Sequence, residues 1–214
     1  MVDKHLIENI LNIKNFDPKE NLVSTLTIAL RGARRLTGRN SDTGLLLKEE
    51  ERLELICQNI ETDHYYSNQL LGITNYLIIL DLIGCVFSRK DETKMSKDGI
   101  EHALLNFSKL NNEDLKAIKA LRNSLAHNFG LGNDAHVFSL SDKYSDMIKT
   151  PNKEDAYYLT KTKEERSYTN VNPNKLFDFI ESIYIMLHQL LEVDKLELKK
   201  GVDEDVIRAK FTIK

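Results

Sequence analysis

The segment ALRNSLAHNFG, residues 120–130, brings a guanidinium, an amide and an imidazole together just before a predicted helix ends. Asn123 and His127 are four residues apart, so a helix places them on one face, and the long side chain of Arg122 can swing toward the same region. The leucines of this helix face the core, so the polar trio is expected on its flank or outer face. There the trio could line a cleft, or a groove between two copies of the chain.

These residue types suit the cleavage of an RNA phosphodiester without a metal ion. Attack by the ribose 2′-hydroxyl needs a base and departure of the 5′-oxygen needs an acid, and a histidine titrates in the range for either role. Arg122 would stabilise the charge of the transition state, and Asn123 could hold the tautomer of the imidazole or bond to a phosphate oxygen. Because His127 lies in the last helical turn, the helix dipole favours its protonated form and a role as general acid.

The pattern Arg-Asn-x-x-x-His in RNSLAH resembles the hallmark motif of the HEPN superfamily (higher eukaryotes and prokaryotes nucleotide-binding). The wider motif of that family is Arg-x4–6-His at the end of a helix in a helical bundle. The resemblance in sequence covers about residues 112–130, and beyond it the resemblance is one of architecture. Active members are metal-independent endoribonucleases, and they usually form homodimers in which two motif helices face each other and build one composite site. The resemblance therefore implies catalytic roles for Arg122, Asn123 and His127, RNA as substrate, and no metal or other cofactor.

The implied function is an RNA hydrolase of antiviral defence or of a toxin–antitoxin pair, with an antitoxin or another regulatory protein as a possible partner. The chain departs from compact members of the family by extra N-terminal helices and a β segment after the motif. An alternative is a non-catalytic HEPN-like module that binds RNA or a partner protein, which the net charge of −3 mildly favours. A third interpretation is a helical dimerisation protein in which Arg122 is a surface residue and His127 is an ordinary C-terminal helix cation.

Asp81 interrupts the apolar run NYLIILDLIGCVF, where an unpaired carboxylate would be costly. Either Asp81 orients Arg122 or His127 from behind, or it lies on a thin exposed strip of its own helix. Tyr76 and Asn75 are weaker candidates for the same cleft.

The densest basic cluster is RGARRLTGR, in which Arg31, Arg35 and Arg39 are spaced by four opposite a leucine face. These arginines could bind RNA phosphates, although such a row is also typical of the solvated face of an amphipathic helix. The histidines and the two cysteines show no metal-ligand spacing, and Cys57 and Cys85 are expected to be buried free thiols.

The elements that must position these residues are predicted to be mainly helical. Apolar periodicity indicates a helical bundle with a small β element inserted before the last long helix. A helix is expected to begin at Asp17-Pro18, with Asp17 as N-cap, and to end at Gly38. The other helices are expected over about 3–14, 47–60, 65–87, 99–109, 112–128 and 174–193, and short strands over 136–141, 156–160, 166–171 and the end of the tail.

The 214 residues are expected to form a single domain. Its parts are an N-terminal helical extension (1–46), core helices with the motif (47–130), a β and loop insertion (131–172), the final long helix (173–194) and a charged tail (195–214). The apolar segment 69–87 contains Thr74, Asn75 and Asp81, so it is predicted to be a buried helix rather than a membrane span. With no apolar signal region at the N-terminus, the protein is expected in the cytoplasm, away from membranes. Its slight acidity means that any polyanion site depends on local cations.

Overall fold

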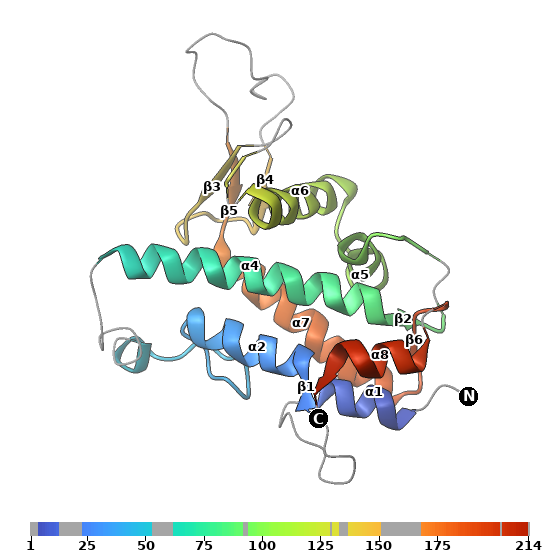
Figure 1. Cartoon of the computed structure of the whole chain (residues 1–214). Helices are drawn as coiled ribbons and strands as arrows, with labels where there is room; N and C mark the ends of the chain where they lie inside the picture. The colour runs from blue at the N-terminus through green and yellow to red at the C-terminus, as the bar shows by residue number, and fades with distance from the viewer. Residues whose placement is uncertain are drawn as a thin grey trace.

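The fold is mainly α, as the sequence predicts (Figure 1). The computed structural model describes residues 4–12, 23–52, 62–91, 94–128, 130–132, 137–150, 168–201 and 203–213, with side chains except at 62–67, 127–128 and 210–213. The helices are α1 (Lys4–Leu11), α2 (Thr25–Leu36), α4 (Thr62–Val86), α5 (Gly99–Phe107), α6 (Asn112–Asn128), α7 (Pro173–Glu192) and α8 (Glu204–Phe211). The strands are β1 (Val23–Ser24), β2 (Phe87–Arg89), β3 (Phe138–Leu140), β4 (Ile148–Lys149), β5 (Thr169–Val171), β6 (Leu196–Leu198) and β7 (Thr212–Ile213).

Helix α4 is the centre of the molecule. It packs most extensively against α5 and α2, and also against α7 and α6. Figure 1 shows α7 behind α4, with α2 on one side of it and α6 on the other. The stretch Asn68–Val86 is long and apolar enough to cross a membrane, but half of it is buried inside the molecule, which is compatible with a soluble protein.

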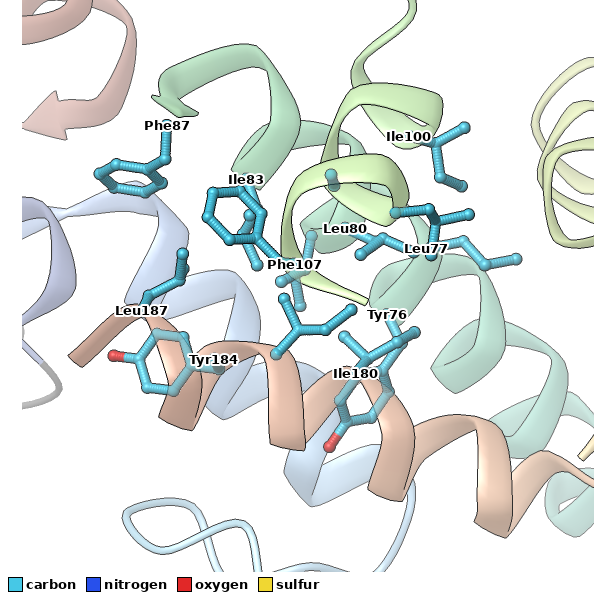
Figure 2. Packing of buried hydrophobic residues seen from close by; sticks show 14 of the residues in the cluster. Tyr76, Leu77, Leu80, Ile83, Phe87, Ile100, Phe107, Ile180, Tyr184 and Leu187 are labelled. Atoms are coloured by element: carbon cyan, nitrogen blue, oxygen red, sulfur yellow. The ribbon is translucent and has the colours of Figure 1, made fainter. Parts of the chain in front are cut away.

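The core forms where α4, α5 and α7 meet (Figure 2). Leu80 and Ile83 from α4, Phe107 from α5, and Ile180 and Leu187 from α7 are all 0% exposed. Burying each such side chain contributes roughly 1.5–3 kcal/mol. Apolar residues of α1 and α2 belong to the same cluster, so the N-terminal helices are part of this core.

Glycines bring α4 and α5 unusually close. A Cβ at Gly84 would lie 1.7 Å from the carbonyl oxygen of Gly99, and a Cβ at Gly99 would lie 2.4 Å from Oδ1 of Asp81. The N-terminus of α5 therefore rests directly on α4 next to Asp81.

Local capping signals explain several helix ends. Asn111 Oδ1 accepts from the backbone N–H groups of Glu113 and Asp114 at 2.9 Å, and α6 runs from Asn112 to Asn128 as predicted. Asn172 caps α7, with Pro173 at its first position. Gly38, at φ +68°, follows the end of α2, where the left-handed conformation favours glycine.

The predicted start of α2 at Asp17 is wrong. The helix begins at Thr25, and Ser24 is its N-cap, with Oγ accepting from the N–H of Thr27 at 3.3 Å. The hydroxyl of Ser24 also donates to the carbonyl of Ile10 at 2.6 Å, which ties α2 to α1. Residues 13–22 themselves lie outside the described part of the chain.

A small sheet separates α6 from α7, as predicted. Its strand order is β3-β5-β4, with β3 parallel and β4 antiparallel to β5. β4 was not predicted, and the expected strand at 156–160 lies outside the described residues. The tail contains more secondary structure than the one strand expected at its end: β6 pairs with β2, β7 pairs with β1, and α8 takes most of the segment expected to be a strand.

Candidate functional site

The structure brings two of the predicted site residues, Arg122 and Asp81, into contact. Arg122 Nη2 from α6 donates to Asp81 Oδ2 from α4, and the two side chains are 27% and 22% exposed. Asp81 is therefore a paired carboxylate that faces the motif helix, and not a solvated residue on an isolated strip. This is the contact expected if Asp81 orients Arg122.

Arg122 also contacts the next residue of the motif. Its Nη1 donates to Oδ1 of Asn123 at 3.0 Å. Its Nε is buried and has no hydrogen-bond partner among the described residues. The exposed 27% of the Arg122 side chain consequently belongs to atoms other than Nε.

A second group of charges fixes α6 one turn before Arg122. Lys119 Nζ donates to Glu101 Oε2 at 2.8 Å and lies 3.2 Å from Asp98 Oδ2. Asp98 caps α5, since its Oδ1 accepts from the N–H of Glu101 at 3.0 Å. Because Lys119 and Arg122 are three residues apart on one side of the helix, these contacts hold the same side of α6 against α5 and α4.

The pKa values follow from these contacts. Burial opposes the ionised form of Asp98, but the Glu101 N–H and the Lys119 ammonium outweigh it and lower the pKa of the carboxyl. The hydrogen bond to Glu101 raises the pKa of Lys119. Both groups are therefore charged near neutral pH. The cluster around Arg122 contains three carboxylates, Asp81, Asp98 and Glu101, and two cations, Lys119 and Arg122.

The third motif residue is placed by its backbone alone. Residue 127 lies in the last turn of α6, one turn beyond Asn123 on the same face, as predicted. The side chain of His127 lies outside the described part of the structure, so its approach to Arg122 stays a prediction.

The prediction of Arg39 as an RNA-binding cation is wrong. Helix α2 ends at Leu36, so the spacing by four does not continue, and the turn at Gly38 carries Arg39 inward. Arg39 is 3% exposed, and its guanidinium donates to Asp178 Oδ1 at 2.8 Å and to the carbonyl of Asn174 at 3.2 Å.

The other two arginines of the expected row remain on α2. Arg31 forms an ion pair with Asp42 at 3.1 Å, and the exposed Arg35 donates to Ser41 Oγ at 3.3 Å. Figure 1 shows α2 across α4 from α6, so these residues do not extend the site around Arg122. Arg35 therefore fits the interpretation of a solvated helix face better than that of an RNA-binding surface.

Sequence reasoning missed a buried network that joins α2, α4 and α7. Arg34 Nε and Nη2 donate to the two carboxylate oxygens of Glu181 at 2.8 and 2.7 Å, and Tyr76 Oη donates to Glu181 Oε1 at 2.7 Å. Tyr76 is thus fully buried, and the expectation that it lines the Arg122 cleft is wrong. Two signals in the sequence could have revealed this network: a glutamate inside the apolar run of α7, and an arginine out of phase with the expected row.

Cys85 is exposed, contrary to prediction, while Cys57 lies outside the described residues. Desolvation and the nearby Asp81 raise the pKa of the Cys85 thiol, so the thiol is the dominant form at neutral pH. Within the described ranges, no group of three or more His, Cys, Asp and Glu side chains could hold a metal ion.

Comparisons of the chain with protein-family models, with curated proteins and with solved structures find no significant match. The motif and the contacts of its residues are therefore the basis on which a function is inferred.

Proposed function

We propose that this chain is a HEPN-like, metal-independent endoribonuclease. The observation that carries the proposal is the ion pair between Arg122 and Asp81, which holds a half-buried guanidinium at the motif end of α6 beside Asn123. A guanidinium whose two Nη nitrogens are fixed by Asp81 and Asn123, and each carry a second hydrogen, can stabilise a pentacovalent phosphate without reorganising.

In the proposed reaction the 2′-oxygen forms a bond to phosphorus as the bond from phosphorus to the 5′-oxygen breaks. A base removes the proton of the 2′-hydroxyl, and an acid delivers a proton to the 5′-oxygen; His127 has one of these roles. The products are a 2′,3′-cyclic phosphate, or its hydrolysed form, and a 5′-hydroxyl. The complementary acid or base would come from a second copy of the chain, in a cytoplasmic homodimer that an antitoxin or another regulatory protein could hold silent.

The test is cleavage of a mixed-sequence RNA in excess chelator by the wild type, His127→Ala and Arg122→Ala. We expect the wild type to cleave and both variants to lose activity, while a control substitution at the exposed Lys109 (Lys109→Gln) leaves the activity unchanged. Equal cleavage by His127→Ala and the wild type would place the activity at another site or in a contaminant.

A second candidate is a non-catalytic module that binds RNA or a partner protein. The pairing of Arg31, Lys119 and Arg122 with carboxylates favours the form that binds a partner protein, because each pair reduces the local positive charge available to a polyanion. This candidate predicts no cleavage by the wild type; RNA binding that weakens in Arg122→Ala, measured by fluorescence anisotropy, would identify the RNA-binding form instead. Neither cleavage nor binding would favour the third interpretation, a helical dimerisation protein.

A further inference from the structure

We propose that Asn123 is a phosphate-binding donor of the catalytic site, and that Arg122 orients its amide for this role. This inference rests on the proposed function. It selects the second of the two roles that the sequence leaves open for Asn123, a bond to a phosphate oxygen rather than orientation of the imidazole.

The first step is the identity of the atom that faces Arg122. A guanidinium carries only hydrogen-bond donors, so the atom 3.0 Å from Nη1 must be the carbonyl oxygen of the Asn123 amide. The Nδ2 amino group consequently points away from the guanidinium.

The second step is the state of that amino group. Asn123 is half-buried. Its Nδ2 forms no hydrogen bond with a described residue, and it is not one of the fully buried polar atoms that lack a partner. Nδ2 is therefore not fully enclosed, and its N–H donors have no acceptor among the described residues; it lies on the face of α6 that leads, one turn later, to residue 127. A hydrogen bond from Nδ2 would be new when a ligand arrives.

The third step is the chain of contacts behind the amide. Asp81 accepts from Nη2 of Arg122, and Nη1 of Arg122 donates to Asn123, so a carboxylate on α4 fixes a guanidinium that in turn fixes an amide on α6. The remaining Nη1 hydrogen and the Nδ2 hydrogens are neighbouring donors. Such a preorganised pair suits the two non-bridging oxygens of a phosphodiester, whose charge increases in the transition state.

Two substitutions separate this role from a merely structural one. Asn123→Asp keeps an oxygen acceptor for Arg122 but replaces the donor group by a second, negatively charged oxygen. Asn123→Ala removes both. Lys109→Gln, on an exposed side chain between α5 and α6, changes the net charge by the same amount as Asn123→Asp and is the matched control.

The experiment is single-turnover cleavage of RNA in chelator, with melting temperatures measured alongside. We expect Asn123→Ala and Asn123→Asp to cleave at least about 100-fold more slowly than the wild type, as for loss of an oxyanion donor. Asn123→Asp should keep the melting temperature of the wild type, and Lys109→Gln should cleave normally.

A substrate with sulfur in place of one non-bridging oxygen of the scissile phosphate gives the second readout. Sulfur accepts hydrogen bonds poorly, so one of the two diastereomers should be cleaved more slowly than the oxygen substrate by the wild type, and this difference should disappear in Asn123→Ala. The pKa values of the pH–rate profile should be the same in both proteins. A shift of the profile with an unchanged sulfur effect would instead assign Asn123 to the imidazole and overturn the inference.

The outcomes distinguish this inference from the proposed function. Full activity of Asn123→Asp, with loss of activity in His127→Ala, would overturn the donor role and leave the nuclease intact. Absence of cleavage by the wild type would overturn both.

Discussion

At the scale of single residues, Arg122 is the group on which the site depends. A half-buried guanidinium needs acceptors, and it finds one on another helix, Asp81, and one on its own, Asn123. Both bonds use the Nη nitrogens, so the position of the charge is set by two different elements. A single free arginine at a helix end would not be held in this way.

Removal of the Asp81 carboxylate should reduce cleavage more than stability. A hydrogen bond between charged groups contributes about 1.5 kcal/mol, which corresponds to about tenfold in rate if it is needed to position Arg122. We expect Asp81→Asn, which keeps an acceptor, to cleave about tenfold more slowly than the wild type in a single turnover, and Asp81→Ala to cleave more slowly still. The unfolding free energy should fall by only about 1 kcal/mol, because the pair is partly solvated.

The matched control is Asp194→Asn, which removes an exposed carboxylate paired with Lys90 at 2.8 Å. It should change neither the cleavage rate nor the stability measurably. Unchanged cleavage by Asp81→Ala would contradict the positioning role of Asp81.

At the scale of elements, the contact between α4 and α5 controls where Asp81 and the α5 N-terminus lie. A methyl group at Gly84 would collide with backbone, the carbonyl of Gly99, so the helices would have to separate. We expect Gly84→Ala to lower the unfolding free energy by about 3 kcal/mol or more, measured by urea denaturation. Gly32→Ala is the control: a Cβ there meets nothing within 4 Å, and the substitution in α2 should stabilise the protein by about 0.5–1 kcal/mol. Equal effects of the two substitutions would contradict the close crossing.

The network of Arg34, Glu181 and Tyr76 should be the most sensitive polar contact between elements. Glu181→Ala leaves a buried guanidinium without its partner, which costs about 3–5 kcal/mol. We expect the free energy of unfolding to fall by this amount, seen as a lower urea midpoint with an unchanged slope. Asp42→Asn, which breaks the more exposed pair with Arg31 at 3.1 Å, should cost less than about 1 kcal/mol. A small effect of Glu181→Ala would mean that Arg34 finds other acceptors.

Helix ends were predictable where a local signal decides them. Asn111 before α6 and Asn172-Pro173 before α7 cap within three residues of their own position, so the sequence contains the whole cause. The start of α2 is different: the strand just before it, β1, pairs with β7, formed by the last residues of the described chain. Pairing between such distant segments has no trace in local periodicity, and Asp17-Pro18 offered a plausible local alternative.

At the scale of the whole molecule, the same distinction explains which parts of the site were predictable. The Asp81 contact was foreseen as one option because a carboxylate in an apolar helix needs a partner. The burial of Arg39 was not, because it depends on the turn at Gly38 and on α7, more than a hundred residues later. Net charge did not reveal that Arg31, Arg34 and Arg39 are all paired with carboxylates.

Buried titratable groups outside the RNSLAH motif should set the pH range of stability. His102 is fully buried, and its Nδ1 accepts from the N–H of Ser96 at 3.4 Å while Nε2 lies 2.8 Å from Ser88 Oγ, so the neutral ring carries its proton on Nε2. Burial, followed by the charge of Lys199, lowers the pKa of His102. Burial also lowers the pKa of His188.

The sign of the acid effect follows from proton uptake. Below about pH 6.5 the unfolded chain protonates both histidines while the folded chain does not, so the unfolded state binds more protons and stability falls as the pH decreases. We expect the urea midpoint to decline from about pH 6.5 downward, with a shallower decline in His102→Gln and His188→Gln. A decline of the same slope in both variants would show that other groups cause it.

The alkaline limit has the opposite sign. Burial raises the pKa values of Tyr76 and Tyr184, and the charge of the Glu181 carboxylate raises them further. The folded protein therefore keeps both phenolic protons at about pH 10, where the unfolded chain begins to lose them. The folded state then binds more protons, and stability falls as the pH rises above about 10. The urea midpoint should therefore form a plateau between about pH 7 and 9.5. In Tyr184→Phe the midpoint should begin to fall only at a higher pH.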